Sequence, residues 1–237
     1  DTDSELSSAR TTTTWTGTRI LTADYTVPAG DTLVIDAGSN IFLDDNVRLY
    51  VEGELDITGT ASNPVVMAKT TTGIAHEGIQ FNATSRNRGS LIQHLVIEDS
   101  EWGITIYNSN PSLNDVYIEN PDYVGIDMFD NADPVIQRLT VQDGGQDVAG
   151  FSVNTRYGIA ISAGASSRPI VLGATFDGLT TRGINMWGGA DGYFRDISIS
   201  NITHIGNQGW KTAGIWVEDS LGLFDNITVD RTDDGVW

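Results

Sequence analysis

Cysteine is absent from the sequence, so neither disulfide bonds nor thiolate metal sites can stabilise the fold. Lysine is almost absent as well, and no run of about 18 apolar residues indicates a membrane span. The sequence begins at Asp1 without the charged and apolar segments of a secretion signal, so we expect any such signal to have been removed. Stability must therefore come from a packed core, and we expect no insertion into a membrane.

Positive charge is scarce. The 32 acidic residues outnumber the 13 basic ones, which gives a net charge of −19. So acidic a surface repels phosphate backbones and anionic lipids, which argues against nucleic-acid and membrane partners. It is typical of a protein kept soluble in salty water, or of one that binds cations. Of the two interpretations we favour the first, a halophilic or marine source.

The N-terminal part of the chain divides into a polar arm and a strand-rich segment. Residues 1–14 are rich in Ser and Thr and show no apolar period, so we expect a flexible arm. From Trp15 to about Lys69, short apolar–polar alternations are separated by Gly, Asp and Asn. This pattern is typical of strands joined by turns, and nothing in it favours a helix.

A repeat begins after residue 73 and has two alternating elements. The first reads Gly-apolar-x-apolar, and the second reads apolar-x-apolar followed by a polar turn. The glycines of the first element are 25, 22, 33, 25, 31 and 21 residues apart. They are Gly78, Gly103, Gly125, Gly158, Gly183, Gly214 and Gly235. Such spacing predicts a solenoid whose rungs carry two loop insertions.

The repeat predicts an all-β fold, a right-handed parallel β-helix of roughly ten rungs over residues 15–237. Each strand pairs in parallel with the same strand of the next rung, ~4.8 Å away, and inward aliphatic residues stack into a core. We expect the segment from Trp15 to Val27 to cover the N-terminal end. Because the sequence stops at Trp237 inside a rung, we expect either a longer polypeptide or a second subunit stacked end to end.

The repeat of residues 73–237 resembles the parallel β-helix of the pectate-lyase-like superfamily. Residues 27–66 are similar to the opening rungs of many secreted and cell-surface β-helix proteins. The resemblance implies a β-helix fold and an extracellular or cell-surface location. It brings polysaccharide lyases, pectin hydrolases and uronate epimerases into consideration, although a fold alone does not fix a function.

The motifs that this resemblance implies for such enzymes are missing. The sequence has no Gly-His-Gly and no Arg-x-Lys element. The histidines, which share no metal-ligand spacing, are His76, His94 and His204. Acidic pairs such as Asp44–Asp45 and Asp233–Asp234 could divide acid and base roles or hold Ca²⁺, but Asp is common in turns. We therefore expect no cofactor and no metal, with calcium as the one ion that the acidic residues would allow.

One outer face of the first repeat element carries most of the candidate chemistry, because its third and fifth residues point outward. The fifth positions are Tyr107, Phe129, Ser162, Trp187 and Glu218, and the third are Thr105, Asp127, Ala160, Asn185 and Trp216. Four aromatic rings beside carboxylate and amide groups form a suitable platform for sugar rings. The candidate ligand-binding residues are Tyr107, Phe129, Trp187, Trp216, Asp127, Asn185 and Glu218.

Two insertions enter the strands of this face, at about Asp143–Arg156 and about Asn201–Thr212, the second with Trp210. In enzymes of the resembled fold, the substrate groove lies on such a face between loops of this kind. The alternative is that the insertions fold over the aromatic rings and bury them. We favour the alternative, because loops of about 12 to 14 residues need a surface to pack against.

Three functions remain open. The leading hypothesis is a non-catalytic module of a secreted or cell-surface protein, a rigid spacer or adhesive domain that binds a polysaccharide or surface glycan. The second is a carbohydrate-active enzyme, a polysaccharide lyase or glycoside hydrolase, that uses acids such as Asp127, Glu218 and Asp219. The third is a structural subunit that associates end to end. An enzyme needs two carboxylates within about 5 to 10 Å, whereas a glycan binder needs exposed, coplanar rings.

Overall fold

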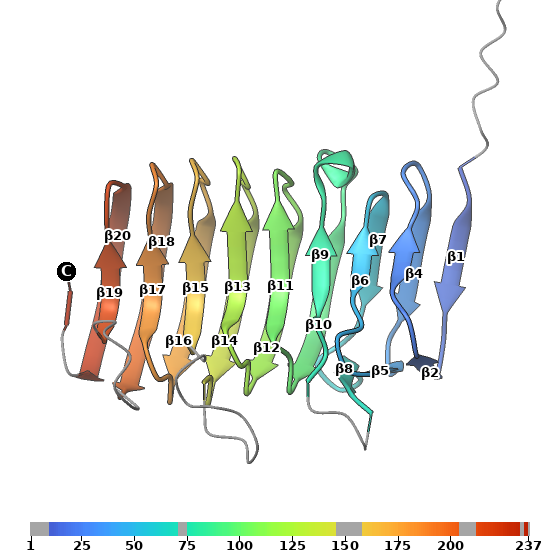
Figure 1. Ribbon diagram of the computed structural model, residues 1–237, viewed down its shortest axis with the longest axis horizontal. Helices are drawn as coiled ribbons and strands as arrows, with labels where there is room; N and C mark the ends of the chain where they lie inside the picture. The colour runs from blue at the N-terminus through green and yellow to red at the C-terminus, as the bar shows by residue number, and fades with distance from the viewer. Residues whose placement is uncertain (1–9, 71–74, 146–157, 204–211, 233–234, 237) are drawn as a thin grey trace, which may run out of the picture.

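The computed structural model is a rod of stacked parallel strands (Figure 1). The structure describes residues 10–70, 75–145, 158–203, 212–232 and 235–236. The strands follow one another along the long axis, from β1 at one end of the rod to β19 and β20 at the other (Figure 1). The predicted β-helix fold is confirmed, and the main path through the larger sheet crosses nine strands, close to the roughly ten rungs expected.

Two sheets form the rod, and within the described residues every pair of strands is parallel. The larger, sheet A, contains β1 (Thr12–Trp15), β2 (Thr18–Leu21), β4 (Thr32–Asp36), β5 (Asn40–Leu43), β7 (Glu54–Thr58), β8 (Val65–Lys69), β10 (Leu91–Glu98), β12 (Ser112–Glu119), β14 (Val135–Gln142), β16 (Ile170–Asp177), β18 (Asp191–Ile202) and β20 (Leu221–Thr232). The smaller, sheet B, contains β3 (Tyr25–Val27), β6 (Leu49–Val51), β9 (Ile79–Phe81), β11 (Trp102–Tyr107), β13 (Val124–Phe129), β15 (Ile159–Ala163), β17 (Arg182–Met186) and β19 (Ala213–Val217). One short 3₁₀ turn, Ala83–Ser85, lies between β9 and β10.

Each long strand of sheet A bends in its middle part, at a residue whose backbone is left-handed and which is skipped in the strand pairing. The bending residues, with φ between 48° and 72°, are His94, Asp115, Arg138, Gly173, Asp196 and Asn226. In the opening rungs the two halves are still separate strands, since the first half of β10 pairs with β7 and the second half with β8. Gly, Asp and Asn are the residue types that adopt this backbone most readily. The bend divides sheet A into two faces, so that each rung has three sides.

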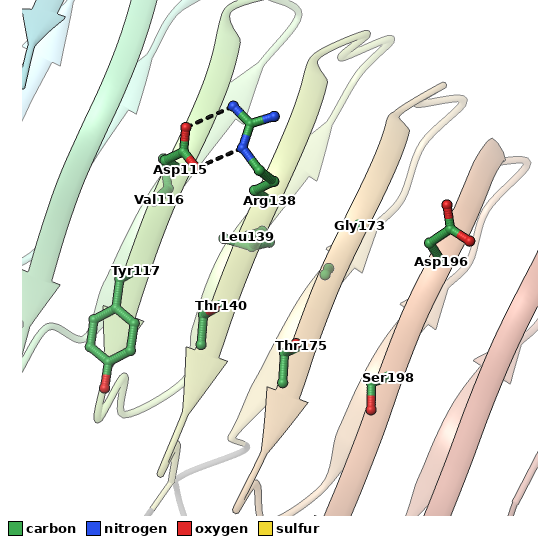
Figure 2. A pocket seen from close by; sticks show the side chains of 11 residues that line it. Asp115, Val116, Tyr117, Arg138, Leu139, Thr140, Gly173, Thr175, Asp196 and Ser198 are labelled. Atoms are coloured by element: carbon green, nitrogen blue, oxygen red, sulfur yellow. Dashed lines mark hydrogen bonds and ion pairs between the residues drawn. The ribbon is translucent and has the colours of Figure 1, made fainter. Parts of the chain in front are cut away.

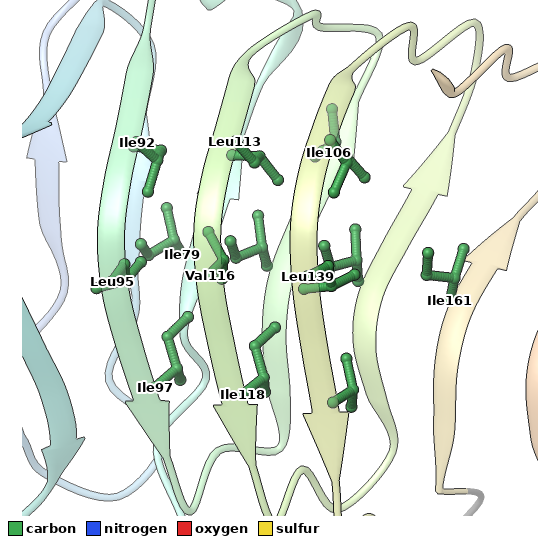
Figure 3. Close-up of a cluster of buried hydrophobic side chains, with 14 of the residues drawn as sticks. Ile79, Ile92, Leu95, Ile97, Ile106, Leu113, Val116, Ile118, Leu139 and Ile161 are labelled. Carbon is green, nitrogen blue, oxygen red and sulfur yellow. The ribbon is translucent and has the colours of Figure 1, made fainter. Parts of the chain in front are cut away.

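Inward side chains form columns that run the length of the rod. One column on sheet B consists of Ile104, Ile126, Ile161, Ile184 and Ile215, which are paired in register and buried. Figure 3 shows the aliphatic side chains of both sheets filling the space between them. Burying one such side chain contributes about 1.5 to 3 kcal/mol, and most of that burial comes from the neighbouring rungs.

The repeated glycine has a steric cause. At Gly103, an added Cβ atom would lie 2.5 Å from the carbonyl oxygen of Gly125 and 2.9 Å from Cδ1 of Ile118. No side chain fits between these atoms without displacing a strand. The glycine therefore sets how closely the next rung packs at the start of this sheet B strand.

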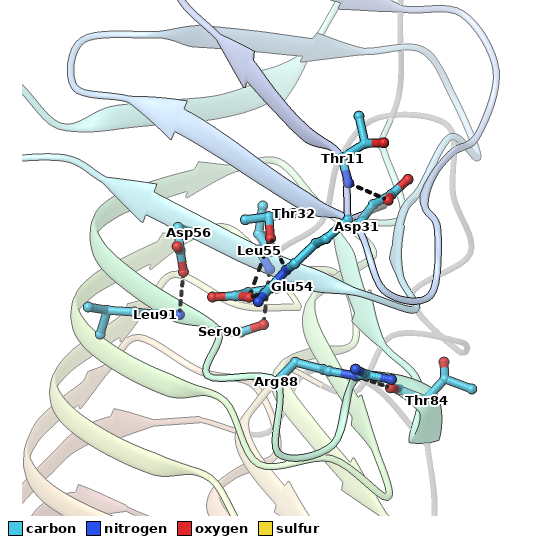
Figure 4. Close-up of polar contacts among 11 residues, drawn as sticks. Thr11, Asp31, Thr32, Glu54, Leu55, Asp56, Thr84, Arg88, Ser90 and Leu91 are labelled. Carbon is cyan, nitrogen blue, oxygen red and sulfur yellow. Dashed lines mark hydrogen bonds and ion pairs between the residues drawn. The ribbon is translucent and has the colours of Figure 1, made fainter. Parts of the chain in front are cut away.

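Polar side chains bind backbone groups where the first rungs turn (Figure 4). The Leu55 amide donates to the Ser90 hydroxyl at 3.0 Å, and the Leu91 amide donates to the Asp56 carboxylate at 3.3 Å. Pairing of this kind satisfies backbone donors that would otherwise lack a partner at the strand ends.

The N-terminal end differs in two details from the sequence-based expectations. Strand β1 begins at Thr12, so it includes three residues assigned to the arm, while residues 1–9 lie outside the described part of the chain. The segment expected to cover the end forms a rung of its own, because β1, β2 and β3 pair with β4, β5 and β6. Within that rung, Trp15 is buried beside Tyr25, and the Arg19 guanidinium lies 4.8 Å from the Trp15 ring centroid.

At the other end, the core residues of β20 are only partly buried. Phe224, Ile227 and Val229 pack against the core, whereas their partners on β18 are fully buried. End-to-end association stays a prediction.

Candidate functional site

The outer surface of sheet B, which we call the sheet B face, presents two rows of outward side chains. The first, which we call the floor row, is largely buried and polar in its middle part. Paired in register from rung to rung, its members are Tyr50, Gln80, Thr105, Asp127, Ser162, Asn185 and Trp216. The second, which we call the rim row, is more exposed and consists of Tyr107, Phe129, Gly164, Trp187 and Glu218. All seven candidate ligand-binding residues lie in these two rows.

The rim row carries three aromatic rings on three different rungs. Tyr107 on β11 is 43% exposed and Trp187, directly after β17, is 37% exposed, while Phe129 on β13 is half-buried. The rings of Phe129 and Trp187 have centroids 6.2 Å apart at an interplanar angle of 69°. The expected coplanar arrangement is therefore absent for this pair, whose rings meet edge to face. A hydrogen bond to Asp130 raises the pKa of the Tyr107 phenol and fixes the position of its hydroxyl group.

A glycine makes room for the indole of Trp187. An added Cβ atom on Gly164 would lie 2.2 Å from the Trp187 ring, so the indole lies directly over the backbone of the neighbouring rung. Its Nε1 donates to the Ser162 hydroxyl at 3.4 Å, a long hydrogen bond. The Trp187 indole thus extends the aromatic surface over the β15 rung, where the rim row has Gly164 instead of an aromatic residue.

The register of β15 differs from the expected one by two residues. Gly158 was expected to align with the other repeat glycines, but Ala160 occupies that position, since Ile161 pairs with Ile126 and Ile184. Ala160 is consequently buried and does not point outward. Ser162 belongs to the floor row beside Asp127 rather than to the rim row.

A hollow of about 350 Å³ lies over β6, β9, β11 and β13 on the sheet B face. Its lining residues are Arg48, Gln80, Trp102, Thr105, Tyr107, Asp127 and Phe129. Asp127 is only 7% exposed, and burial raises the pKa of its carboxyl group from 3.8 to about 7. Hydrogen bonds with the Ser162 hydroxyl and the Met128 backbone oppose the rise without cancelling it. The hollow therefore contains a carboxyl group that titrates near neutral pH.

The arginine in this hollow is already paired. Arg48 makes an ion pair with Glu77 at 2.9 Å, donates from Nε to the Glu77 carbonyl oxygen at 3.0 Å, and also donates to the side chain of Gln80. Its guanidinium carbon lies 5.5 Å from the ring centroid of Trp102, which in turn stacks on Tyr123. Arg48 thus fixes one wall of the hollow, and its charge is balanced by Glu77.

A second group of candidate residues lies toward the C-terminal end of the face. Arg182 is 5% exposed, donates to the Asn185 side chain at 2.5 Å, and places its guanidinium 4.4 Å from the Trp216 ring centroid. Burial lowers the pKa of Arg182, while Glu218 opposes that effect. The Trp216 indole donates to the Glu218 carboxylate at 3.4 Å.

The acids named for a catalytic role do not meet. Asp127 lies on β13 and Glu218 follows β19, three rungs away, which is about 14 Å at the usual strand spacing. Asp219 comes after Glu218 and is exposed. Within the described part of the chain, no group of three or more His, Asp or Glu side chains is placed to hold a metal ion. The Asp44 and Asp45 carboxylates accept hydrogen bonds from Thr70 and the Ala75 amide.

Most of both insertions, including Trp210, lies outside the described residues, which omit 146–157 and 204–211. The prediction that they cover or wall the aromatic face stays untested.

A larger hollow, of about 500 Å³, lies on the outside of sheet A. Figure 2 shows its row of small hydroxyl side chains, Thr140, Thr175 and Ser198, below the ion pair of Asp115 with Arg138. That ion pair keeps the pKa of Asp115 below its usual value. This hollow lacks the combination of exposed rings and a buried carboxyl group, so the sheet B face is the stronger candidate.

The comparison with solved structures supports the fold. No protein-family model and no curated protein sequence matches the chain. Among solved structures, the crystal structure of alginate lyase from Paenibacillus sp. str. FPU-7 is similar, with a TM-score of 0.56 and 14% sequence identity. The match covers 90% of this chain and 76% of that one. Among the described residues, no helix is long and apolar enough to cross a membrane. At this identity, the likeness shows that the chain shares the fold of that enzyme.

Proposed function

We propose that the sheet B face binds a polysaccharide that lies along the rod and crosses the strands. The observation that carries the proposal is the rim row, in which Tyr107, Phe129 and Trp187 present aromatic surface on three rungs of one solvent face. Exposed apolar side chains that gather on one face are a feature of interaction sites, and flat rings fit the apolar faces of sugar rings. An extended sugar chain also has a repeat comparable to the rung spacing of ~4.8 Å, so successive sugars can meet successive rungs.

The floor row supplies the polar partners that such a ligand needs. Gln80, Thr105 and Asn185 carry amide and hydroxyl groups that both donate and accept hydrogen bonds, as sugar hydroxyls do. A few placed polar groups beside apolar contact surface are typical of ligand sites. The similar fold of an alginate lyase, an enzyme that by its name acts on a polysaccharide, supports the same ligand class.

We propose a binding module of a secreted or cell-surface protein rather than an enzyme. The separation of Asp127 from Glu218 supports this choice, since about 14 Å is too far for a pair of carboxylates to share one glycosidic bond. A rigid rod with a continuous binding face suits adhesion or spacing at a glycan-rich surface.

The test begins with a glycan array and continues with calorimetric titration of a bound oligosaccharide. Tyr107→Ala and Trp187→Ala are each expected to weaken binding about tenfold, equivalent to about 1.4 kcal/mol. Tyr117→Ala, an aromatic deletion on sheet A, is the matched control and should bind like the wild type. Unchanged affinity in the Trp187 variant, or an equal loss in the Tyr117 variant, would contradict the proposal.

A polysaccharide-cleaving enzyme is the second candidate, and Asp127 is the observation that favours it. A carboxyl group with a pKa of about 7 beside an exposed phenol has the properties of a general acid or base. Incubation with a polysaccharide panel, with reducing ends and unsaturated products measured, separates the two candidates. Product formation that Asp127→Asn abolishes would favour the enzyme.

A further inference from the structure

We propose that the ligand of the sheet B face is an uncharged polysaccharide, and that the Asp127 carboxyl group binds it as a protonated acid. This inference rests on the proposed function and adds the chemical class of the ligand and the pH range in which it binds.

The position of Asp127 is the first argument. Its side chain lies in the floor row at the bottom of the hollow, with Tyr107 and Phe129 beside it in the lining. A protonated carboxyl group both donates and accepts hydrogen bonds, whereas a carboxylate only accepts them. The protonated form therefore matches a sugar hydroxyl in either orientation, and its binding leaves no net charge buried beneath the ligand.

The surroundings of Asp127 favour the protonated form. Its neighbours in the floor row are Thr105 on β11 and Ser162 on β15, which are both neutral. The charged or titratable groups that share the hollow are Arg48 and Tyr107; Arg48 is paired with Glu77, and Tyr107 is bonded to Asp130. Among the described residues no cation forms an ion pair with the Asp127 carboxylate, so its burial raises the pKa of Asp127 to about 7.

Among the described residues, the second cation of the face is engaged too, which argues against a polyanionic ligand. Arg182 donates to Asn185 and lies over the ring of Trp216. A polyuronate would bring one negative charge per sugar to a chain that already carries a net charge of −19. Like-charge repulsion of this kind disfavours both association and the bound state. An uncharged chain avoids that repulsion and still uses the rings of the rim row.

The expected pH dependence follows from the fraction of protein in the protonated form. If only that form binds, the apparent dissociation constant rises tenfold for each pH unit above about 7, or about 100-fold between pH 5 and pH 9. The dependence belongs to Asp127 only if a non-titrating replacement removes it.

The experiment measures binding of cellohexaose, mannohexaose and xylohexaose as uncharged probes, and of an alginate hexamer as the anionic probe, at pH 5, 7 and 9. We expect an uncharged probe to bind about 100-fold more weakly at pH 9 than at pH 5, and the alginate hexamer to bind more weakly than the best uncharged probe. Asp127→Asn keeps a donor and an acceptor, so its binding should be independent of pH. Asp225→Asn removes an exposed carboxylate from sheet A and should behave as the wild type does.

Three results would overturn the inference: tighter binding of the alginate hexamer, binding of the uncharged probe that does not change with pH, or an unchanged pH profile in Asp127→Asn. The proposed function survives each of them as long as Trp187→Ala weakens the binding. Absence of binding to every probe and to the glycan array would instead overturn the proposed function itself.

Discussion

Replacement of Asp127 by asparagine is expected to stabilise the protein at neutral and alkaline pH. The carboxyl group has a pKa of about 7 in the folded chain and an ordinary value of 3.8, so the unfolded chain loses its proton first as the pH rises. The protonated group makes its full contribution to the free energy of unfolding below pH 3.8. That contribution falls as the pH rises to about 7 and stays low above that pH. The difference between these two pKa values corresponds to about 4 kcal/mol in the free energy of unfolding.

Asparagine has nearly the same shape, cannot ionise, and still accepts a hydrogen bond from Ser162. Asp127→Asn should therefore equal the wild type near pH 3.5 and exceed it by up to about 4 kcal/mol at pH 8, which raises the melting temperature by roughly 10 °C. Urea unfolding and thermal melts at both pH values measure this gain, with Asp225→Asn as the control. A variant that is no more stable than the wild type at pH 8 would refute the assignment of a buried, uncompensated carboxyl group.

Three further outcomes are expected. His76 is fully buried and its pKa is lowered to about 4, so its contribution to stability is complete above pH 6.5 and falls by about 3 kcal/mol toward pH 4. This pH dependence of stability runs opposite to that of Asp127, so urea unfolding should show it most clearly in the Asp127→Asn variant. Adding His76→Gln to that variant should remove the pH dependence, and a dependence that persists would contradict its assignment to His76. Gly164→Ala should displace the Trp187 ring and weaken polysaccharide binding while changing the melting temperature little, and full affinity in calorimetry would count against the proposed binding face. Ile126→Ala should lower the free energy of unfolding by about 2 to 5 kcal/mol, as urea unfolding would measure, and a smaller loss would mean that its column is loosely packed.

The fold was predictable because its cause is repeated in the sequence. From β9 onward, every described strand of sheet B except β15 has a glycine where the next rung's carbonyl approaches, as at Gly103, and an inward isoleucine one residue later. The repeat glycine nevertheless predicted the wrong register for β15. There Ala160 is small enough to take the glycine's place, and the column of Ile161 rather than Gly158 aligns the strand.

The candidate site was predictable only in part. The outward aromatic residues follow from the two-residue period of a strand, so Tyr107 and Trp187 were found. Arg48 was missed because it precedes β6 in the opening rungs, where the repeat glycine is absent, and only the pairing through β9 brings it near Trp102. The raised pKa of Asp127 could not be predicted from the sequence either, because it depends on how deeply the neighbouring rungs bury a side chain that points outward.

A crystal structure of the protein with a bound hexasaccharide would show directly whether the sheet B face binds a polysaccharide. We expect sugar density along the sheet B face, across β11, β13 and β17, with rings against Tyr107 and Trp187 and a hydroxyl group within hydrogen-bond distance of Asp127. Density over the hydroxyl row of sheet A, beside Thr140 and Thr175, with the sheet B face empty, would contradict it.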